Sequence, residues 1–402
     1  MLLNISKEAA VKITSVEVYV KQYANFPISK SVFCVINTDE GICGYGEAGV
    51  SFISGSYATA EMIKDYAKLI IGMDPLENSV IWNKLFTKTY WTQGNGAIVI
   101  SAISAIDIAV WDIKGKALNV PVYKLLGGKH RDSVRCYASQ LQFGWDCLKP
   151  AKELEAYRRN AEIAVERGYD AVKVDPLQFA DKQAGHLVDG QNYGDLDPHV
   201  RKVIDDRLRV TRETVGPDAD IILELHCSTT YDTALEICRI AEQYDIMYAE
   251  EALNTLNPAL TKELSQNTKI PLANGERTYL REGFLPFLRD RSLALIQPDL
   301  GICGGITEGM RIADLAAIYH VGVQAHVCGT PISTAAGLHF EAAIPNFTIH
   351  ETHIAALYEP FVEMADCGFI PENGRLSIPE KPGLGITLTD KAFENAEKSV
   401  VK

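Results

Sequence analysis

Short apolar runs return at regular intervals through the last two thirds of the chain, and sequence of helical pattern separates them. This alternation predicts successive βα units in a parallel sheet. Eight such runs predict an α/β fold, a (β/α)8 barrel of the TIM type, with the carboxyl ends of its strands on one face. The runs begin at Val134, Tyr169, Ala219, Ile246, Ile270, Leu293, Val321 and Phe347.

A different pattern precedes the barrel. Residues 12–47 alternate between apolar and polar side chains, which is typical of strands, and residues 60–118 have the apolar spacing of helices. The end of the chain is rich in proline and glycine. We therefore expect three parts: an α+β module over residues 1–130, the barrel over 131–356, and a C-terminal segment, 357–402, that packs back against the first module.

Three glutamates, Glu224, Glu250 and Glu276, each end an apolar run and lie 26 residues apart. A single glutamate in such a place is usually an exposed loop residue. Three at the same phase of the repeat would meet at the carboxyl ends of neighbouring barrel strands. Carboxylates confined together need a compensating cation, and a set of oxygen ligands suits a hard ion, so the pattern predicts a Mg²⁺ site.

Histidines follow the same strand ends. His226 lies two residues after Glu224, so strand alternation turns both side chains toward the same face, and His226 is a candidate general acid. Asp299 and His326 end the adjacent runs six and seven, so they are expected within hydrogen-bonding reach of each other. An aspartate that holds an imidazole in one tautomer raises its basicity, which makes this pair a candidate general base. A packing histidine and a structural Asp–His hydrogen bond are the alternatives.

Three further polar residues are predicted to line a substrate site. Lys173 and Asp175 end the second barrel strand, and Glu351 ends the eighth. Lys173 can neutralise a substrate carboxylate, or it can pair with Asp175 or another acid. Glu351 can hydrogen-bond a substrate or remain a solvated acid. The sequence leaves these alternatives open.

Composition narrows the class of function. The 402 residues are 47% hydrophobic, which is typical of globular domains, and the formal net charge is −13. Without a basic cluster, nucleic acid is not an expected partner. We also expect no membrane span, because no window approaches ~20 apolar residues. The nine cysteines are scattered without a CxxC spacing, so we expect a protein of the reducing cytoplasm, without a zinc or disulfide framework.

Several stretches together resemble the enolase superfamily, in its mandelate racemase subgroup, and most of all sugar-acid dehydratases of the galactonate and gluconate type. These stretches are GYGEA, SAIDIAVWDIKGKALNVPVYKLLGG, AVKVDP, LELH, AEE, NGER, IQPDLGICGGITEG, AHVCGT and PEKPGLGI. The resemblance implies a capping domain built from both chain ends and one Mg²⁺ held by Glu224, Glu250 and Glu276. It also implies a homo-oligomer that acts on a small sugar acid.

One departure bears on the reaction. Asp175 stands where related racemases carry a second lysine base, which disfavours racemisation by two bases. We therefore expect Mg²⁺-dependent dehydration of an aldonate, of galactonate, gluconate or mannonate type, to a 2-keto-3-deoxy acid through an enediolate. His326, oriented by Asp299, would remove the α-proton, and His226 would protonate the leaving hydroxyl. The alternatives are a sugar-acid epimerase or racemase, and a catalytically idle sugar-acid-binding protein on the same scaffold.

The choice among sugar acids is not readable from the chain. Family resemblance implies that loops of the capping domain set specificity, and the equivalent stretches are residues 25–30 and 50–57. A turn-rich insertion, residues 189–199, is expected to overhang the barrel mouth.

Overall fold

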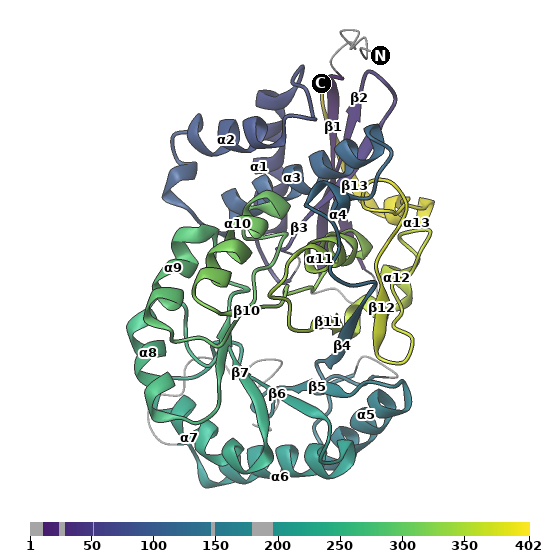
Figure 1. Cartoon of the computed structure of the whole chain (residues 1–402). Helices are drawn as coiled ribbons and strands as arrows, with labels where there is room; N and C mark the ends of the chain where they lie inside the picture. The colour runs from purple at the N-terminus through teal and green to yellow at the C-terminus, as the bar shows by residue number, and fades with distance from the viewer. Residues whose placement is uncertain (1–10, 24–28, 51, 146–148, 179–195) are drawn as a thin grey trace.

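A four-stranded antiparallel sheet joins the two ends of the chain (Figure 1). The computed structural model describes residues 11–23, 29–50, 52–145, 149–178 and 196–402. The C-terminal strand pairs with the first strand along its whole length, from Val16 opposite Val401 to Lys21 opposite Ala396. The strands are β1 (Ile13–Gln22), β2 (Lys30–Thr38), β3 (Cys43–Ala48) and β13 (Ala396–Val401), in the order β13-β1-β2-β3.

Helices cover one face of this sheet. The helical pattern predicted as continuous over residues 60–118 is divided into α1 (Ser56–Ile70), α2 (Asn78–Thr87), the short η1 (Thr92–Gly94) and α3 (Ala97–Ala117). The long helix α3 lies directly on β3, because Gly44 and Gly46 have no side chain; a Cβ at either would overlap a carbonyl oxygen of α3. A four-residue helix, α4 (Val122–Leu125), leads into the second part of the chain.

The predicted barrel is confirmed. Its eight strands are parallel neighbours in chain order, β11 pairs with β4, and a bridge between Val323 and Phe347 joins the remaining edge. A further strand, β12 (Arg375–Ser377), lies antiparallel to β4. The eight are β4 (Ser133–Ser139), β5 (Ala171–Val174), β6 (Asp220–Glu224), β7 (Ile246–Glu250), β8 (Leu272–Asn274), β9 (Leu295–Ile296), β10 (Gly322–Val323) and β11 (His350–His353).

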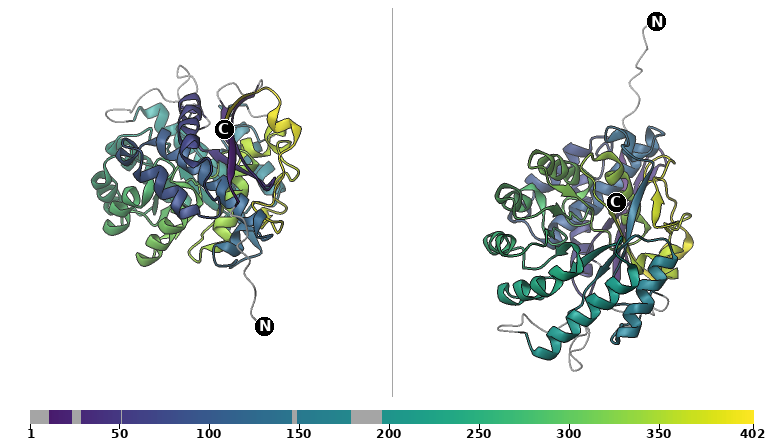
Figure 2. Two further views of the ribbon diagram at one scale, coloured as in Figure 1. Left: turned by 90° about the horizontal axis from the view of Figure 1, so that it is seen from above. Right: turned by 60° about the horizontal axis from the view of Figure 1, so that its bottom comes forward.

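In the described part of the chain, seven α-helices connect the eight strands, and the first five of them lie around the outside of the strands in Figure 1; Figure 2 gives two further views. Between β11 and β13 the chain forms, besides β12, the short helices η3 (Ile354–Leu357), α12 (Glu359–Val362) and α13 (Asp390–Phe393). The seven are α5 (Leu154–Glu166), α6 (Pro198–Val215), α7 (Tyr231–Ala241), with the short η2 (Glu242–Tyr244) after it, α8 (Pro258–Asn267), α9 (Leu280–Asp290), α10 (Gly305–Ile318) and α11 (Pro331–Ala343).

The inside of the barrel is filled by one apolar layer. Strands β4 to β9 each contribute one residue, and Ile349 precedes β11. The packed interior side chains hold the strands in fixed positions, and the carboxyl ends of the strands lie just beyond this layer. The members are Tyr137, Ala171, Ile222, Tyr248, Ala273, Leu295 and Ile349.

The N-terminal module rests on the loops that follow β9 and β10, and in the second of these Thr330 donates a hydrogen bond of 2.6 Å to Glu47. Trp82 of α2 donates a hydrogen bond of 2.8 Å to the carbonyl of Gly304, and the Gly49 amide donates one of 2.9 Å to the carbonyl of Gly301. Because these loops follow the carboxyl ends of barrel strands, the module covers the face on which the site residues were predicted. Over the described ranges, no helix has the length and apolar character needed to cross a bilayer.

Candidate active site

A polar layer lies immediately above the apolar layer of the barrel. Strand side chains alternate, so the residue two positions after each interior residue also points inward. On β4, β5, β6 and β7 this position belongs to a polar residue, and Glu351 occupies it on β11. This alternation therefore places five polar side chains in one ring, and all five are buried. They are Ser139, Lys173, Glu224, Glu250 and Glu351.

Lys173 is the centre of this ring. Its Nζ lies 2.7 Å from Glu250 Oε1, 3.0 Å from Glu224 Oε2 and 3.1 Å from Glu351 Oε1. Burial lowers the pKa of the lysine, but the surrounding carboxylates outweigh burial and raise the pKa well above its ordinary value. Of the alternatives left open by the sequence, the structure has Lys173 paired with acids, and these acids do not include Asp175.

Glu224 and Glu250 meet the conditions for cation ligands. They lie opposite each other in the register of β6 and β7. Burial and the neighbouring Glu224 carboxylate raise the pKa of Glu250, because a second ionised carboxylate is unfavourable at this position unless a cation compensates it. Glu250 Oε2 is buried and accepts no hydrogen bond from the described residues, whereas Glu224 Oε2 faces Lys173 Nζ at 3.0 Å. A free carboxylate oxygen next to a second carboxylate fits a hard divalent ion such as Mg²⁺.

Glu276 lies beyond the end of β8 and has other neighbours. Its Oε1 lies 2.6 Å from Arg277, and its Oε2 lies 3.2 Å from Nε2 of His326. Accordingly, within the described part of the chain no three acidic, histidine or cysteine side chains already surround a common point as metal ligands do. The carboxylate of Glu276 nevertheless interacts electrostatically with Glu224 and Glu250, which keeps it a candidate third ligand.

Asp299 and His326 form the hydrogen bond expected from the sequence. Asp299 Oδ2 lies 2.7 Å from His326 Nδ1, and Asp299 Oδ1 accepts the backbone N–H of Gly301 at 2.7 Å. Burial lowers the pKa of His326, but Glu276, Glu351 and Asp299 outweigh burial and raise it to about 10. The aspartate leaves Nε2 as the ring nitrogen that faces the carboxylates.

His226 has a partner that sequence reasoning did not assign to it. Its Nδ1 lies 2.7 Å from Asp175 Oδ2, whereas its Nε2 lies 3.3 Å from the Gln140 amide nitrogen, a long distance for a hydrogen bond. Burial lowers the pKa of His226, but the carboxylates of Glu224 and Asp175 outweigh burial and raise it to about 9. The carboxylates thus favour an imidazolium, the form that a general acid requires.

Glu351 and His353 occupy the same face of β11. Glu351 accepts hydrogen bonds from Ser139 Oγ at 2.7 Å and from the Val327 amide at 3.1 Å. His353 was not predicted as a site residue, although its position two residues after Glu351 is a signal of the same kind. Its Nδ1 accepts the Ala355 amide at 3.1 Å, so the ring proton is on Nε2.

The environment of His353 supports a place in the site. Burial lowers the pKa of His353 to about 3, so the ring is neutral at physiological pH. Its charge would interact with Glu351, Lys173 and both proposed catalytic histidines. The ring of Phe52, from the predicted specificity stretch 50–57, lies 6.2 Å away between centroids. Most of the stretch 25–30 and of the insertion 189–199 lies outside the described residues.

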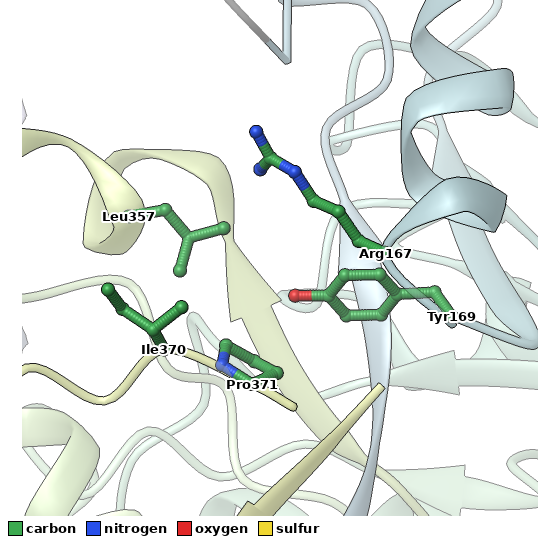
Figure 3. Close-up of a pocket in the computed structure, with 5 residues that line it drawn as sticks. All are labelled: Arg167, Tyr169, Leu357, Ile370 and Pro371. Atoms are coloured by element: carbon green, nitrogen blue, oxygen red, sulfur yellow. The ribbon is translucent and has the colours of Figure 1, made fainter. Parts of the chain in front are cut away.

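A separate pocket of about 340 Å³ lies away from this constellation (Figure 3). Arg167 and Tyr169, just before β5, face Leu357, Ile370 and Pro371 from the C-terminal segment. None of the predicted catalytic, metal or substrate residues lines it. The chemistry-bearing side chains are therefore gathered at the carboxyl ends of the strands and not in this pocket.

Comparison with known proteins agrees with this architecture. Residues 12–127 match the N-terminal domain of mandelate racemase and muconate lactonizing enzyme, and residues 156–392 match the enolase C-terminal domain-like family. A structure of an enolase superfamily member from Salmonella Typhimurium is 46% identical, with a TM-score of 0.92, and the match covers 98% of this chain and 100% of that one.

Two relatives have names that state an activity. A D-xylonate dehydratase from Haloferax volcanii is 35% identical over 364 residues, which is 89% of this chain and 83% of that protein. A D-galactonate dehydratase from Xanthomonas campestris is 32% identical over 373 residues, which is 92% of this chain and 91% of that protein.

Proposed function

The chain belongs to the mandelate racemase and muconate lactonizing enzyme family of the enolase superfamily and is a carbon–oxygen lyase, and we propose that it dehydrates an aldonate sugar acid with the help of Mg²⁺. One observation carries the proposal: two histidines, each held by an aspartate, flank a buried group of carboxylates at the barrel mouth. The D-xylonate and D-galactonate dehydratases among its relatives support an aldonate as the substrate class.

Glu224, Glu250 and Glu276 would hold the ion. A bound Mg²⁺ would supply positive charge that stabilises the negative charge developing on the substrate carboxylate. Glu250 fits this role through its buried, unpartnered Oε2, and Glu224 lies opposite it on the neighbouring strand. Lys173, which contacts both carboxylates, remains beside them as a second positive charge. Glu276 would have to exchange its contact with His326 for the ion.

Each histidine would move one proton. A cation held at Glu276 would offset the negative charge that raises the pKa of His326, so that Nε2 of His326 takes the proton from C2. The electron pair of the C–H bond passes into an enediolate of the substrate. Nε2 of His226 gives its proton to the 3-hydroxyl, the C3–O bond breaks, and water leaves as the enediolate electrons form a double bond between C2 and C3. The resulting enol becomes a 2-keto-3-deoxy acid. Each such proton transfer typically contributes about 10²- to 10⁴-fold to the rate.

The test is incubation of the purified full chain with Mg²⁺ and a panel of aldonates in D2O, followed by NMR. The proposal requires a 2-keto-3-deoxy acid from at least one pentonate or hexonate. It also requires that His326→Asn abolish both the product and the exchange of the C2 proton. A panel without any dehydrated product would refute it.

Epimerisation is a second candidate, and a specific observation favours it. Although Asp175 removes a lysine base, it gives His226 the same kind of partner as His326 has, so the site contains two imidazole–carboxylate pairs. The NMR experiment distinguishes the two reactions, because an epimerase would accumulate a deuterated C2 epimer without a keto acid. We retain two further expectations as part of the proposal: a homo-oligomer, from family resemblance, and a location in the reducing cytoplasm, from the scattered cysteines.

A further inference from the structure

The side chain of Asp175 is held by hydrogen bonds to protein groups at both of its carboxylate oxygens. It is 4% exposed, and its Oδ1 accepts the backbone N–H groups of Leu177 at 2.9 Å and Gln178 at 2.8 Å. Its Oδ2 is the atom that meets Nδ1 of His226. Both carboxylate oxygens thus already have protein partners, and neither is directed at a ligand.

The turn that carries Asp175 is itself anchored from behind. The buried guanidinium of Arg207, on α6, donates hydrogen bonds of 2.8 Å to the carbonyls of Pro176 and Gln178. The hydroxyl of Tyr157, on α5, lies 3.3 Å from the carbonyl of Asp175. Two outer helices therefore hold the backbone on which the carboxylate is mounted.

The same arrangement recurs on the other side of the site. Asp299 also uses Oδ1 to accept the amide two residues later, Gly301, and Oδ2 to hold Nδ1 of a histidine at 2.7 Å. Asp175 repeats both features, with Leu177 in the place of Gly301. Two strand ends thus provide equivalent aspartate supports for two histidines.

We propose that Asp175 is the positioning residue of His226, which keeps the Nδ1 proton of the ring in place and directs Nε2–H at the leaving hydroxyl. This inference rests on the proposed dehydration and assigns Asp175 a role in it other than contact with substrate. A carboxylate only accepts hydrogen bonds, so it selects the ring form that is protonated on Nδ1.

The substitution Asp175→Asn tests the inference. If the amide oxygen keeps the bonds from Leu177 and Gln178, the amide nitrogen faces His226 and donates to Nδ1. The ring proton must then move to Nε2 of a neutral imidazole, which is a poor acid. We expect dehydration to fall by roughly 10²-fold or more, while exchange of the C2 proton, which depends on His326, stays within a few-fold of wild type. Asp299→Asn, the matched control, should lose exchange and dehydration together.

A substrate analogue separates a proton-delivery defect from a distorted site. Fluoride leaves without needing a strong acid, so a 3-deoxy-3-fluoro analogue of the best aldonate in the panel should restore Asp175→Asn to within a few-fold of wild type. An equal defect with both substrates would overturn the inference. So would Asp175→Asn with normal dehydration, provided His226→Gln is inactive. If His226→Gln itself dehydrates normally, the proposed acid is wrong as well.

A measurement without substrate completes the test. Nitrogen NMR of the Mg²⁺-loaded protein with labelled histidine should show His226 protonated on Nδ1 in wild type. In Asp175→Asn the signal should move to the form protonated on Nε2 alone, and the His326 signals should not change. An unchanged His226 signal would overturn the inference even if no substrate had been found.

Discussion

Lys173 is the residue that makes the buried carboxylates compatible with a folded barrel. An ionised carboxylate without a partner is costly in a protein interior, and here three share one ammonium group. The sequence placed Lys173 at a strand end but could not distinguish a substrate ligand from an internal counter-ion. Only the register of β5 with β6, which sets Val174 beside Leu223, brings its side chain to Glu224.

Replacement of this lysine is expected to destabilise the protein strongly. Lys173→Met keeps the length of the side chain but leaves the carboxylates uncompensated, so the free energy of unfolding without metal should fall by about 3–5 kcal/mol. Urea unfolding measures it. Lys68→Met is the control, because Lys68 is exposed and, among the described residues, forms an ion pair with Asp65 on its own helix; it should change stability by less than about 0.5 kcal/mol. Equal effects would contradict the role of Lys173.

His353 is expected to contribute to substrate binding rather than to proton transfer. Its neutral ring offers Nε2–H as a donor next to Glu351, on the side of Phe52. Loss of one hydrogen bond of about 1–1.5 kcal/mol corresponds to a roughly tenfold weaker affinity. His353→Phe, which preserves the ring, should raise KM by about that factor with kcat changed less than threefold. Steady-state kinetics with the preferred aldonate measures both, and a large fall in kcat alone would assign His353 to the chemistry instead.

At the scale of elements, the apolar runs located all eight barrel strands to within a few residues. They could do so because each buried strand is a short apolar segment, and these segments recur at regular intervals along the chain. The spacing of the runs did not predict the position of Glu276, the third proposed ligand. Glu224 and Glu250 are the last residues of β6 and β7, but β8 ends at Asn274, two residues before Glu276. Equal spacing along the chain therefore did not mean an equal place in the fold.

The contact between β3 and α11 could not be predicted either, since 283 residues separate its partners. Glu47 is fully buried, and its Oε2 accepts the hydroxyls of Thr330 at 2.6 Å and Ser333 at 2.8 Å. Burial raises the pKa of Glu47 from about 4.5 to about 7, although these hydrogen bonds oppose the change. This single side chain joins the N-terminal module to the loop that follows His326.

This contact predicts a pH-dependent stability. Between about pH 4.5 and pH 7 the folded protein holds a proton on Glu47 that the unfolded chain releases, so stability falls as the pH rises through this window and is constant above it. Relative to Glu47→Gln, wild type should lose on the order of 3 kcal/mol across the window. Urea unfolding of both proteins at several pH values measures the difference. A difference that does not vary with pH would show that Glu47 does not change its protonation on folding.

At the scale of the whole molecule, the two ends of the chain meet in one sheet above a barrel whose mouth collects the charged residues. The fold class followed from periodicity, and the family from motifs spread over the chain. The partners of Lys173 and Asp175 did not follow, because each is set by the register of neighbouring strands and by the turns beyond them. These contacts decide which acids are available to a metal ion and which are already engaged.

A metal ion that binds this mouth should therefore stabilise the whole protein. Ligand that binds only the folded state at 100 times its Kd adds about 2.7 kcal/mol to the free energy of unfolding. We expect Mg²⁺ to raise Tm by a few degrees in wild type. The rise should be absent in Glu250→Gln, which keeps the shape of the ligand without its charge and which should also show no heat of Mg²⁺ binding in calorimetry. Ca²⁺ at the same ionic strength controls for nonspecific screening by a divalent salt. Unchanged Mg²⁺ affinity in Glu250→Gln would remove Glu250 from the metal site, and with it the arrangement on which the proposed dehydration depends.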